Sequence, residues 1–175
     1  LIYVDPAMAD NGVLYTGFTP EFAKEMGKLC GKADVIVPNL TEASFMLGVD
    51  YVGEDYDEAY IRDLLKQLTG LGCKTAVLTG VSFAPGQIGA MAYDAATDTY
   101  ASYFNEKLPV SFHGTGDVFA SALAALLVRG APLSAALETA TALTDESICR
   151  SLWRDTPRRF GVDFEGALPA YIRRV

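Results

Sequence analysis

Short, almost continuous apolar runs alternate along the chain with longer stretches in which apolar residues recur every three or four positions. Such runs are typical of strands buried in a parallel sheet, and such stretches are typical of helices packed on it. The runs predict strands at residues 2–4, 35–37 and 75–79. The alternation predicts an α/β fold of three layers, in which a mainly parallel central sheet is covered by helices on both faces.

The helices follow from capping residues and from apolar spacing. Thr19 before Pro20 and, further on, Asp57 are typical helix starts, and Gly48 is a typical helix end. The second helix begins at Asn39 or at Thr41. We expect helices from Thr19 through Leu29, from Asn39 or Thr41 through Leu47, from Asp57 through Leu68, at 118–128, from Leu133 to Leu152 or Trp153, and at 164–173 after a polar connection at 154–163.

Two further segments have patterns of their own. Residues 87–94 and 99–105 are predicted to form a β-hairpin. Residues 6–18 are predicted as a loop in which Asn11 and Gly12 form a turn. The chain starts directly with an apolar strand, and a buried parallel strand normally has neighbours on both sides. We therefore expect residues 1–175 to be a single domain that forms the C-terminal portion of a longer protein.

Composition and charge narrow the function. Half of the 175 residues are hydrophobic, which is typical of a globular domain with a real core. The formal net charge of -8 argues against broad binding to nucleic acid or to anionic membranes, and no apolar run is long enough to span a membrane. Three widely spaced cysteines, Cys30, Cys73 and Cys149, fit free thiols in a reducing cytoplasm.

The most informative segment is Gly114-Thr115-Gly116-Asp117, which opens an apolar helical stretch. Backbone N–H groups at a helix start are unpaired donors with partial positive charge, so they form an anion site that glycine leaves accessible. An aspartate there can accept a proton from a hydroxyl group that attacks a phosphoryl group. The alternative is that Asp117 simply caps the helix.

Other polar residues follow the predicted strands. They are Asp5, Asn39 with Glu42, and Thr79 with Gly80. Because ligands gather beyond the carboxyl ends of parallel strands, we expect these residues and the glycine loop to converge on one rim. Asp5 and Glu42 are candidates for Mg²⁺, directly or through water. The alternatives are that Asp5 satisfies loop amides and that Glu42 favours its helix start. Asp10 is a further candidate for a position near the cation or the phosphates. The alternative is that Asp10 serves only the structure of its turn.

These residues resemble those of ribokinase-fold small-molecule kinases. The glycine loop with Asp117 resembles the anion hole and catalytic base of that superfamily. Residues 4–10 with Gly12 and Tyr15, and residues 36–43, are similar to the pattern of pyridoxal kinases. Residues 77–80 match the strand end that meets ATP phosphates.

The resemblance implies ATP-dependent phosphorylation of the 5′-hydroxymethyl group of a vitamin B6 vitamer, by a cytoplasmic homodimer. By matched position, Asp117 would be the base, and Gly114, Thr115 and Gly116 would form the anion hole. The implied nucleotide residues are Asn39, Thr79, Gly80, Asp10 and Thr115, and the implied Mg²⁺ residues are Asp5 and Glu42. The alternatives are a hydroxymethylpyrimidine kinase, in which a cysteine typically replaces Asp117, another kinase of this fold, or a non-catalytic nucleotide-binding homologue.

Overall fold

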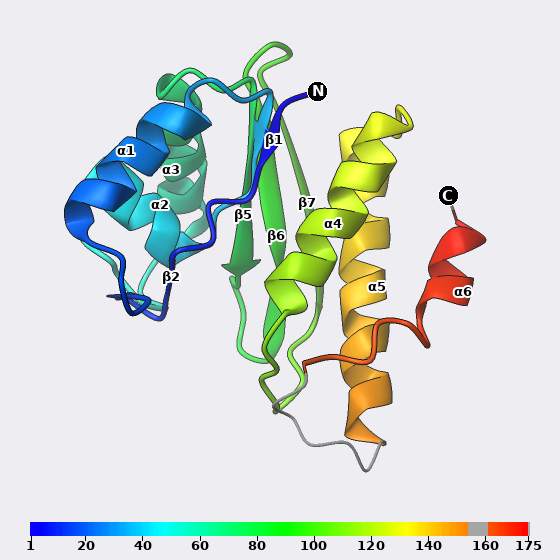
Figure 1. Cartoon of the computed structure of the whole chain (residues 1–175). Coiled ribbons are helices and arrows are strands. Elements are labelled where there is room, and N and C mark those ends of the chain that lie inside the picture. Colours follow the sequence, from blue (N-terminus) through cyan, green and yellow to red (C-terminus); the bar gives the residue numbers. More distant parts are fainter. Residues whose placement is uncertain (154–160, 175) are drawn as a thin grey trace. The chain divides into compact units, whose positions relative to one another are not determined.

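The computed structural model describes residues 1–153 and 161–174 (Figure 1). Most of the polar connection predicted at 154–163 therefore lies outside the described residues. Contacts divide the chain into two compact units, one formed by residues 1–85 and 90–101 and the other by residues 86–89 and 102–175. In the described part of the chain, no helix is both long enough and apolar enough to cross a membrane.

The five strands of the main sheet lie in the order β1-β4-β5-β6-β7. Their bounds are β1 (Tyr3–Val4), β4 (Val35–Ile36), β5 (Thr75–Val81), β6 (Gln87–Asp94) and β7 (Thr99–Glu106). β4 pairs in parallel with β1 on one side and with β5 on the other. The predicted α/β class, the parallel pairing of the first three strands and the hairpin of the last two are confirmed.

The helices are α1 (Pro20–Cys30), α2 (Leu40–Leu47), α3 (Glu58–Gly70), α4 (Thr115–Val128), α5 (Leu133–Leu152) and α6 (Leu168–Ile172). The predicted caps are confirmed, since the side chains of Thr19 and Asp57 accept hydrogen bonds from the backbones of Phe22 and Tyr60. Asn39, rather than Thr41, caps α2. Capping thus fixes where three helices begin.

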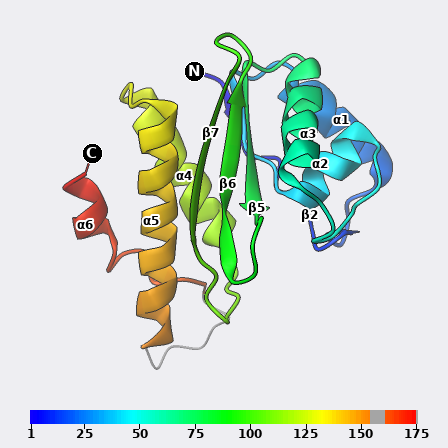
Figure 2. The same ribbon diagram turned by 180° about the vertical axis from the view of Figure 1, so that it is seen from behind.

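The core of the first unit lies between its sheet and its helices. Helices α1, α2 and α3 lie on one face of the sheet (Figure 2). The four apolar positions that predict α3 are all buried, namely Ile61, Leu64, Leu65 and Leu68. In the second unit, α4 and α5 pack side by side in opposite directions, and α6 packs on α5 (Figures 1 and 2).

Several details differ from the sequence predictions. β1 is half-buried rather than buried, because among the described strands it lies at the edge of the sheet and pairs with β4. β5 continues through Gly80 instead of ending before it. α4 begins at Thr115, three residues before the expected start, because helical backbone extends into the glycine loop. The last helix covers only residues 168–172 of the ten expected.

The segment predicted as a loop at residues 6–18 contains a small hairpin. Its strands are β2 (Ala9–Asp10) and β3 (Val13–Leu14), which pair antiparallel. Asn11 and Gly12 both have positive φ, at 51° and 78°, as a tight hairpin turn requires. The predicted turn is confirmed, but strands of two residues are too short to produce a visible alternation.

The ends of α1 and α3 approach each other closely before β4 and β5 begin. A Cβ on Gly31 would lie 2.3 Å from the carbonyl oxygen of Leu71, and a Cβ on Gly72 would lie 2.6 Å from the carbonyl oxygen of Gly31. The neighbouring Cys30 and Cys73 are free and buried, and burial raises their thiol pKa values to about 12 and about 11. These two cysteines therefore serve packing.

Candidate functional site

The start of α2 is organised by a reciprocal pair of hydrogen bonds. The backbone N–H of Glu42 donates to Asn39 Oδ1 over 2.9 Å, and the backbone N–H of Asn39 donates to Glu42 Oε2 over 2.8 Å. This is a capping box, which satisfies two N–H groups that a helix start leaves unpaired. β4 ends at Ile36, and Val37 and Pro38 lead directly to the box, so the box stands just beyond the carboxyl end of that strand.

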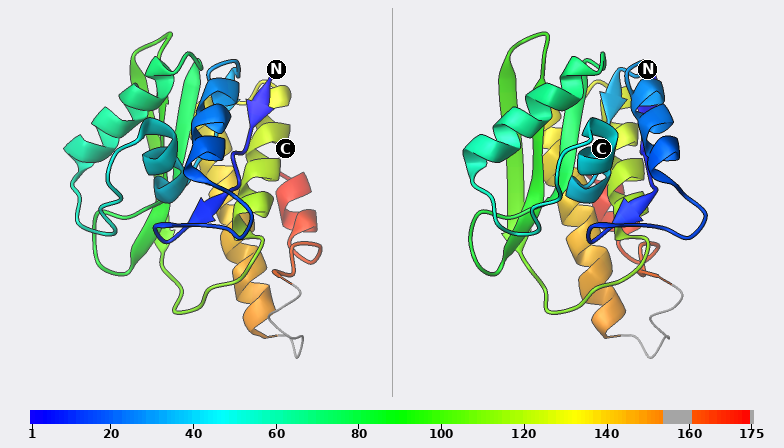
Figure 3. Two further views of the ribbon diagram at one scale, coloured as in Figure 1. Left: turned by 60° about the vertical axis from the view of Figure 1, so that its left-hand side comes forward. Right: turned by 90° about the vertical axis from the view of Figure 1, so that its left-hand side faces the viewer.

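The same helix start holds the β2–β3 hairpin in place (Figure 3). Asn39 Nδ2 donates to the carbonyl oxygen of Ala9 over 2.8 Å, and Glu42 Oε1 accepts from the backbone of Met8 over 3.0 Å. A longer bond of 3.5 Å joins the N–H of Ala9 to the same oxygen. Thr41 Oγ1 accepts from the backbone of Gly12 over 3.0 Å, which is a role that the sequence did not reveal.

Asp10 and Thr79 complete this side of the candidate site. Asp10 is exposed, and its carboxylate accepts from the backbone and the side chain of Asn11. Thr79 forms a parallel bridge with Asn39 and donates its N–H to Pro38 over 3.1 Å. Gly80, exposed and with φ of 72°, leaves the backbone beyond Thr79 open. The first unit therefore brings Asn39, Glu42 and Thr79 together.

Asp5 and Glu42 influence each other electrostatically. Glu42 is only 4% exposed, and burial raises its pKa from the ordinary value of 4.5 to about 7. Its bonds from backbone N–H groups oppose that rise in pKa, whereas the negative charge of Asp5 adds to it. Burial, and to a smaller degree the charge of Asp5, raises the pKa values of Tyr3 and Cys30 as well. Two carboxyl groups that repel each other are a suitable setting for a cation.

The carboxylate oxygens of Asp5 and Glu42 suit Mg²⁺ better than a cation that takes all its ligands from the protein. Glu42 already accepts two N–H groups on Oε1 and one on Oε2, so few of its lone pairs are open for a metal. Mg²⁺ usually keeps several waters and takes one or two carboxylates. Within residues 1–153 and 161–174, no three His, Cys, Asp or Glu side chains gather around one point. Contact through water is the arrangement that these residues can provide.

The raised pKa of Glu42 predicts a pH-dependent stability. The folded protein holds the proton of the Glu42 carboxyl group more tightly than the unfolded chain does. The stabilisation that this proton gives is therefore complete below about pH 4.5 and is lost as the pH rises through about 7. We expect the free energy of unfolding of the wild type, relative to Glu42→Gln, to fall by about 3 kcal/mol across that interval. Urea denaturation at several pH values measures this difference. If the difference in unfolding free energy between the two proteins does not change with pH, the raised pKa of Glu42 is wrong.

The second unit holds the glycine loop and the start of α4. Gly114 is the N-cap residue, with φ of 83°, and within residues 1–153 and 161–174 no side chain caps the helix. The helix closes with the N–H of Val118 donating to the carbonyl of Gly114 over 3.1 Å, and Thr115 Oγ1 donates to Phe112 over 3.4 Å. First-turn N–H groups without a side-chain cap are the donors that an anion site at a helix start requires, and the anion hole itself stays a prediction.

Asp117 is exposed and lies in the first turn of α4. A Cβ on Gly114 would lie 3.9 Å from Asp117 Oδ2, so the carboxylate lies near the glycine end of the helix. The alternative in which Asp117 caps the helix is wrong, because Gly114 occupies that position. The carboxylate is therefore accessible for another role beside the N–H groups.

The structure thus assembles the candidate residues in two groups. Asp5, Asp10, Asn39, Glu42, Thr79 and Gly80 belong to the first unit, and Gly114, Thr115, Gly116 and Asp117 belong to the second. That the two groups face one rim stays a prediction. One positioning residue without a sequence signal is Tyr56, whose Oη accepts from the backbone of Ser82 over 3.0 Å, just beyond β5.

The chain is similar in sequence to two kinds of small-molecule kinase. The sequence profile described as phosphomethylpyrimidine kinase matches residues 2–156. The chain is 30% identical over 146 residues to the pyridoxine/pyridoxal/pyridoxamine kinase of Bordetella avium, covering 81% of this chain and 47% of the relative. It is 32% identical over 117 residues to the hydroxymethylpyrimidine/phosphomethylpyrimidine kinase of Haemophilus influenzae, covering 65% and 42%.

Among solved structures, a Bacteroides thetaiotaomicron protein crystallised with pyridoxal superposes with a TM-score of 0.92 at 33% identity. The match covers 98% of this chain and 60% of that one. The chain spans half or less of the length of the curated relatives it matches. Because the profile covers most of the chain and the fold agrees over nearly all of it, the chain belongs to the phosphomethylpyrimidine and pyridoxal kinase family of ribokinase-like proteins.

Proposed function

We propose that this chain is the ATP-binding and catalytic-loop portion of a kinase that phosphorylates the 5′-hydroxymethyl group of a vitamin B6 vitamer. The observation that carries the proposal is the start of α4, where Gly114 leaves the helix without a side-chain cap and Asp117 lies exposed beside it. Family membership supports the same reaction class. The homodimer and the cytoplasmic location implied by the resemblance belong to this proposal.

In the proposed reaction, each group has one task. Asp117 accepts the proton of the vitamer hydroxyl as the hydroxyl oxygen attacks the terminal phosphorus of ATP, and the bond from that phosphorus to the bridging oxygen breaks to release ADP. The backbone N–H groups of Thr115 and Gly116, which Gly114 leaves accessible, stabilise the negative charge on the transferring phosphoryl oxygens. Because phosphoryl transfer depends mainly on positioning and charge stabilisation, a weakly basic carboxylate is sufficient.

The first unit would hold the nucleotide and its cation. Thr79 and Gly80 would offer a hydroxyl group and an open backbone to the phosphates. Asn39, which bridges to Thr79 and donates to Ala9, and Asp10, which follows Ala9, would also bind the nucleotide. Asp5 and Glu42 would hold Mg²⁺, Glu42 through water, because its oxygens already accept backbone N–H groups. Bound there, Mg²⁺ would neutralise charge on the ATP phosphates.

Hydroxymethylpyrimidine is the second candidate substrate. The matched profile and the Haemophilus influenzae relative favour it. Asp117 favours the B6 vitamers, because the resemblance assigns a cysteine to this position in most hydroxymethylpyrimidine kinases. A non-catalytic nucleotide-binding role has no use for a carboxylate at that position.

Steady-state assays with the full-length protein test the proposal. ATP, Mg²⁺ and either pyridoxal, pyridoxamine or hydroxymethylpyrimidine are supplied, and phosphorylated product is measured. We expect kcat/KM for the preferred B6 vitamer to exceed that for hydroxymethylpyrimidine by at least about 100-fold, since a site that hydrogen-bonds one ring discriminates strongly against another. A preference for hydroxymethylpyrimidine would select the second candidate. No product from any of the three would refute both.

A further inference from the structure

The C-terminal strap, which we define as residues 161–174, begins against the residue that precedes the glycine loop. Gly161 has φ of 82°, and a Cβ at this position would lie 3.1 Å from the carbonyl oxygen of His113. His113 directly precedes Gly114, the N-cap of α4. The strap therefore touches the backbone one residue before the proposed anion hole.

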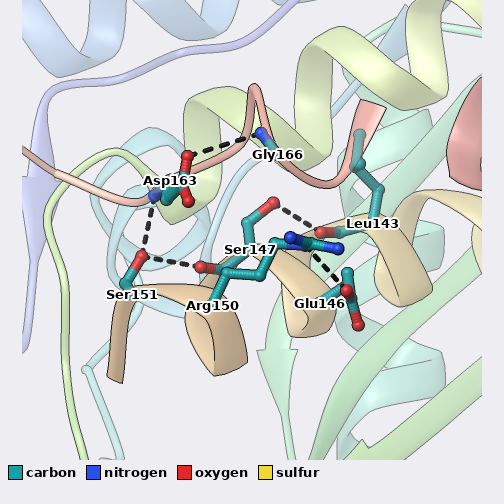
Figure 4. A network of polar contacts seen from close by, with 7 residues as sticks. All are labelled: Leu143, Glu146, Ser147, Arg150, Ser151, Asp163 and Gly166. Carbon is teal, nitrogen blue, oxygen red and sulfur yellow. Dashed lines mark hydrogen bonds and ion pairs between the residues drawn. The ribbon is translucent and has the colours of Figure 1, made fainter. Parts of the chain in front are cut away.

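Hydrogen bonds fix this end of the strap to α5 (Figure 4). The backbone N–H of Asp163 donates to Ser151 Oγ over 2.7 Å, and Ser151 Oγ donates to the carbonyl of Ser147 over 2.6 Å. Ser147 Oγ continues the series by donating to Leu143 over 2.6 Å. Ser151 thus uses both its acceptor and its donor, so that the strap is held directly against a regular helix.

The segment after Asp163 also packs tightly on α5. The N–H of Gly166 donates to Asp163 Oδ1 over 3.4 Å, which closes a turn within the strap. A Cβ on Gly166 would lie 3.2 Å from Arg150 Cδ and 3.1 Å from Asp163 Oδ2. Arg150 is itself oriented by Glu146, 2.8 Å from its Nε. The strap has little room to move at this point.

The far end of the strap reaches α4. Tyr171 Oη donates to the carbonyl oxygen of Ala122 over 2.9 Å. The strap consequently joins the loop before α4, the last turns of α5 and the middle of α4. These three anchor points lie within the second unit.

We propose that Ser151 is a positioning residue, which through the strap and Gly161 holds the His113–Gly116 backbone where its N–H groups meet the transferring phosphoryl group. No side chain of the described residues caps α4, so the placement of these N–H groups depends on backbone contacts such as the one with Gly161. Small displacements of charge-stabilising groups lower kcat more than they weaken substrate binding. This inference rests on the proposed kinase function.

The test compares variants of α5 in the full-length protein. Ser151→Ala removes the acceptor for the strap, Ser151→Thr restores a hydroxyl group, and Thr144→Val removes a hydroxyl group that donates only within α5, to Ala140. Gly161→Ala perturbs the same contact from the strap side. Amide hydrogen exchange at residues 113–117 and steady-state kinetics are measured for each variant.

We expect Ser151→Ala and Gly161→Ala to speed exchange at residues 113–117 and to lower kcat by about tenfold, with KM for ATP nearly unchanged. Ser151→Thr and Thr144→Val should resemble the wild type in both measurements. Unchanged exchange at 113–117 in both Ser151→Ala and Gly161→Ala would overturn the inference, and so would faster exchange without loss of kcat. If the wild type phosphorylates nothing, the proposed function fails, whereas the exchange data still decide whether the strap holds the loop.

Discussion

Asp117→Asn is expected to lower kcat for vitamer phosphorylation on the order of 10³-fold, as removal of a general base commonly does. The amide of Asn cannot accept the hydroxyl proton, although its size and shape are nearly those of Asp. ATP binding should persist or tighten slightly, because the substitution removes a negative charge near the phosphates. Steady-state assays and calorimetric titration with ATP measure the two quantities separately.

A matched control removes an acid from another helix start. Glu21 lies exposed in the first turn of α1, so Glu21→Gln alters a helix terminus in the same way without touching the glycine loop. We expect it to leave kcat unchanged. Near-normal turnover by Asp117→Asn would refute the assignment of the base, and loss of ATP binding would show that the carboxylate acts in nucleotide binding instead.

Gly31→Ala is expected to lower the free energy of unfolding by about 3 kcal/mol. The backbone at Gly31 has φ of -64°, which alanine adopts readily, so the whole effect is steric. The added methyl group would lie 2.3 Å from the carbonyl oxygen of Leu71, and backbone on both sides must move to accommodate it. Urea denaturation of the full-length protein measures the change.

Gly70→Ala is the matched control for that substitution. Gly70 ends α3 one residue before Leu71, and a Cβ there would meet nothing within 4 Å. We expect Gly70→Ala to raise the free energy of unfolding by up to about 1 kcal/mol, since alanine favours the helix and restricts the unfolded chain. Equal effects of the two substitutions would show that the contact between α1 and α3 yields easily.

The elements that could be predicted from the sequence are those with strong local signals. The buried stripe of α3 and the caps at Thr19 and Asp57 appear as expected, because apolar periodicity and side-chain capping act over a few residues. The β2–β3 hairpin has no comparable local signal, because its short strands are held by the start of α2, about 30 residues away. β5 continues through Gly80 to Val81, because a glycine does not by itself end a strand.

In the candidate site, too, some features have a local sequence signal and others depend on contacts between distant residues. The capping box of Asn39 and Glu42 is visible in the sequence as an Asn with a Glu three residues later. The contacts of Glu42 with Met8, and the resulting burial of its carboxyl group, depend on tertiary structure and have no sequence signal. The same is true of Tyr56 and of the strap, whose partners are distant in sequence.

The way β6 and β7 are shared between the two compact units limits how this protein can be divided experimentally. The chain passes from one unit to the other between residues 85 and 86, 89 and 90, and 101 and 102, each time inside or beside one of these strands. No single cut therefore yields two fragments that each contain one whole unit. Separate expression of a nucleotide half and a glycine-loop half should give insoluble or unfolded pieces, and functional complementation would require that the hairpin remain intact in one of them.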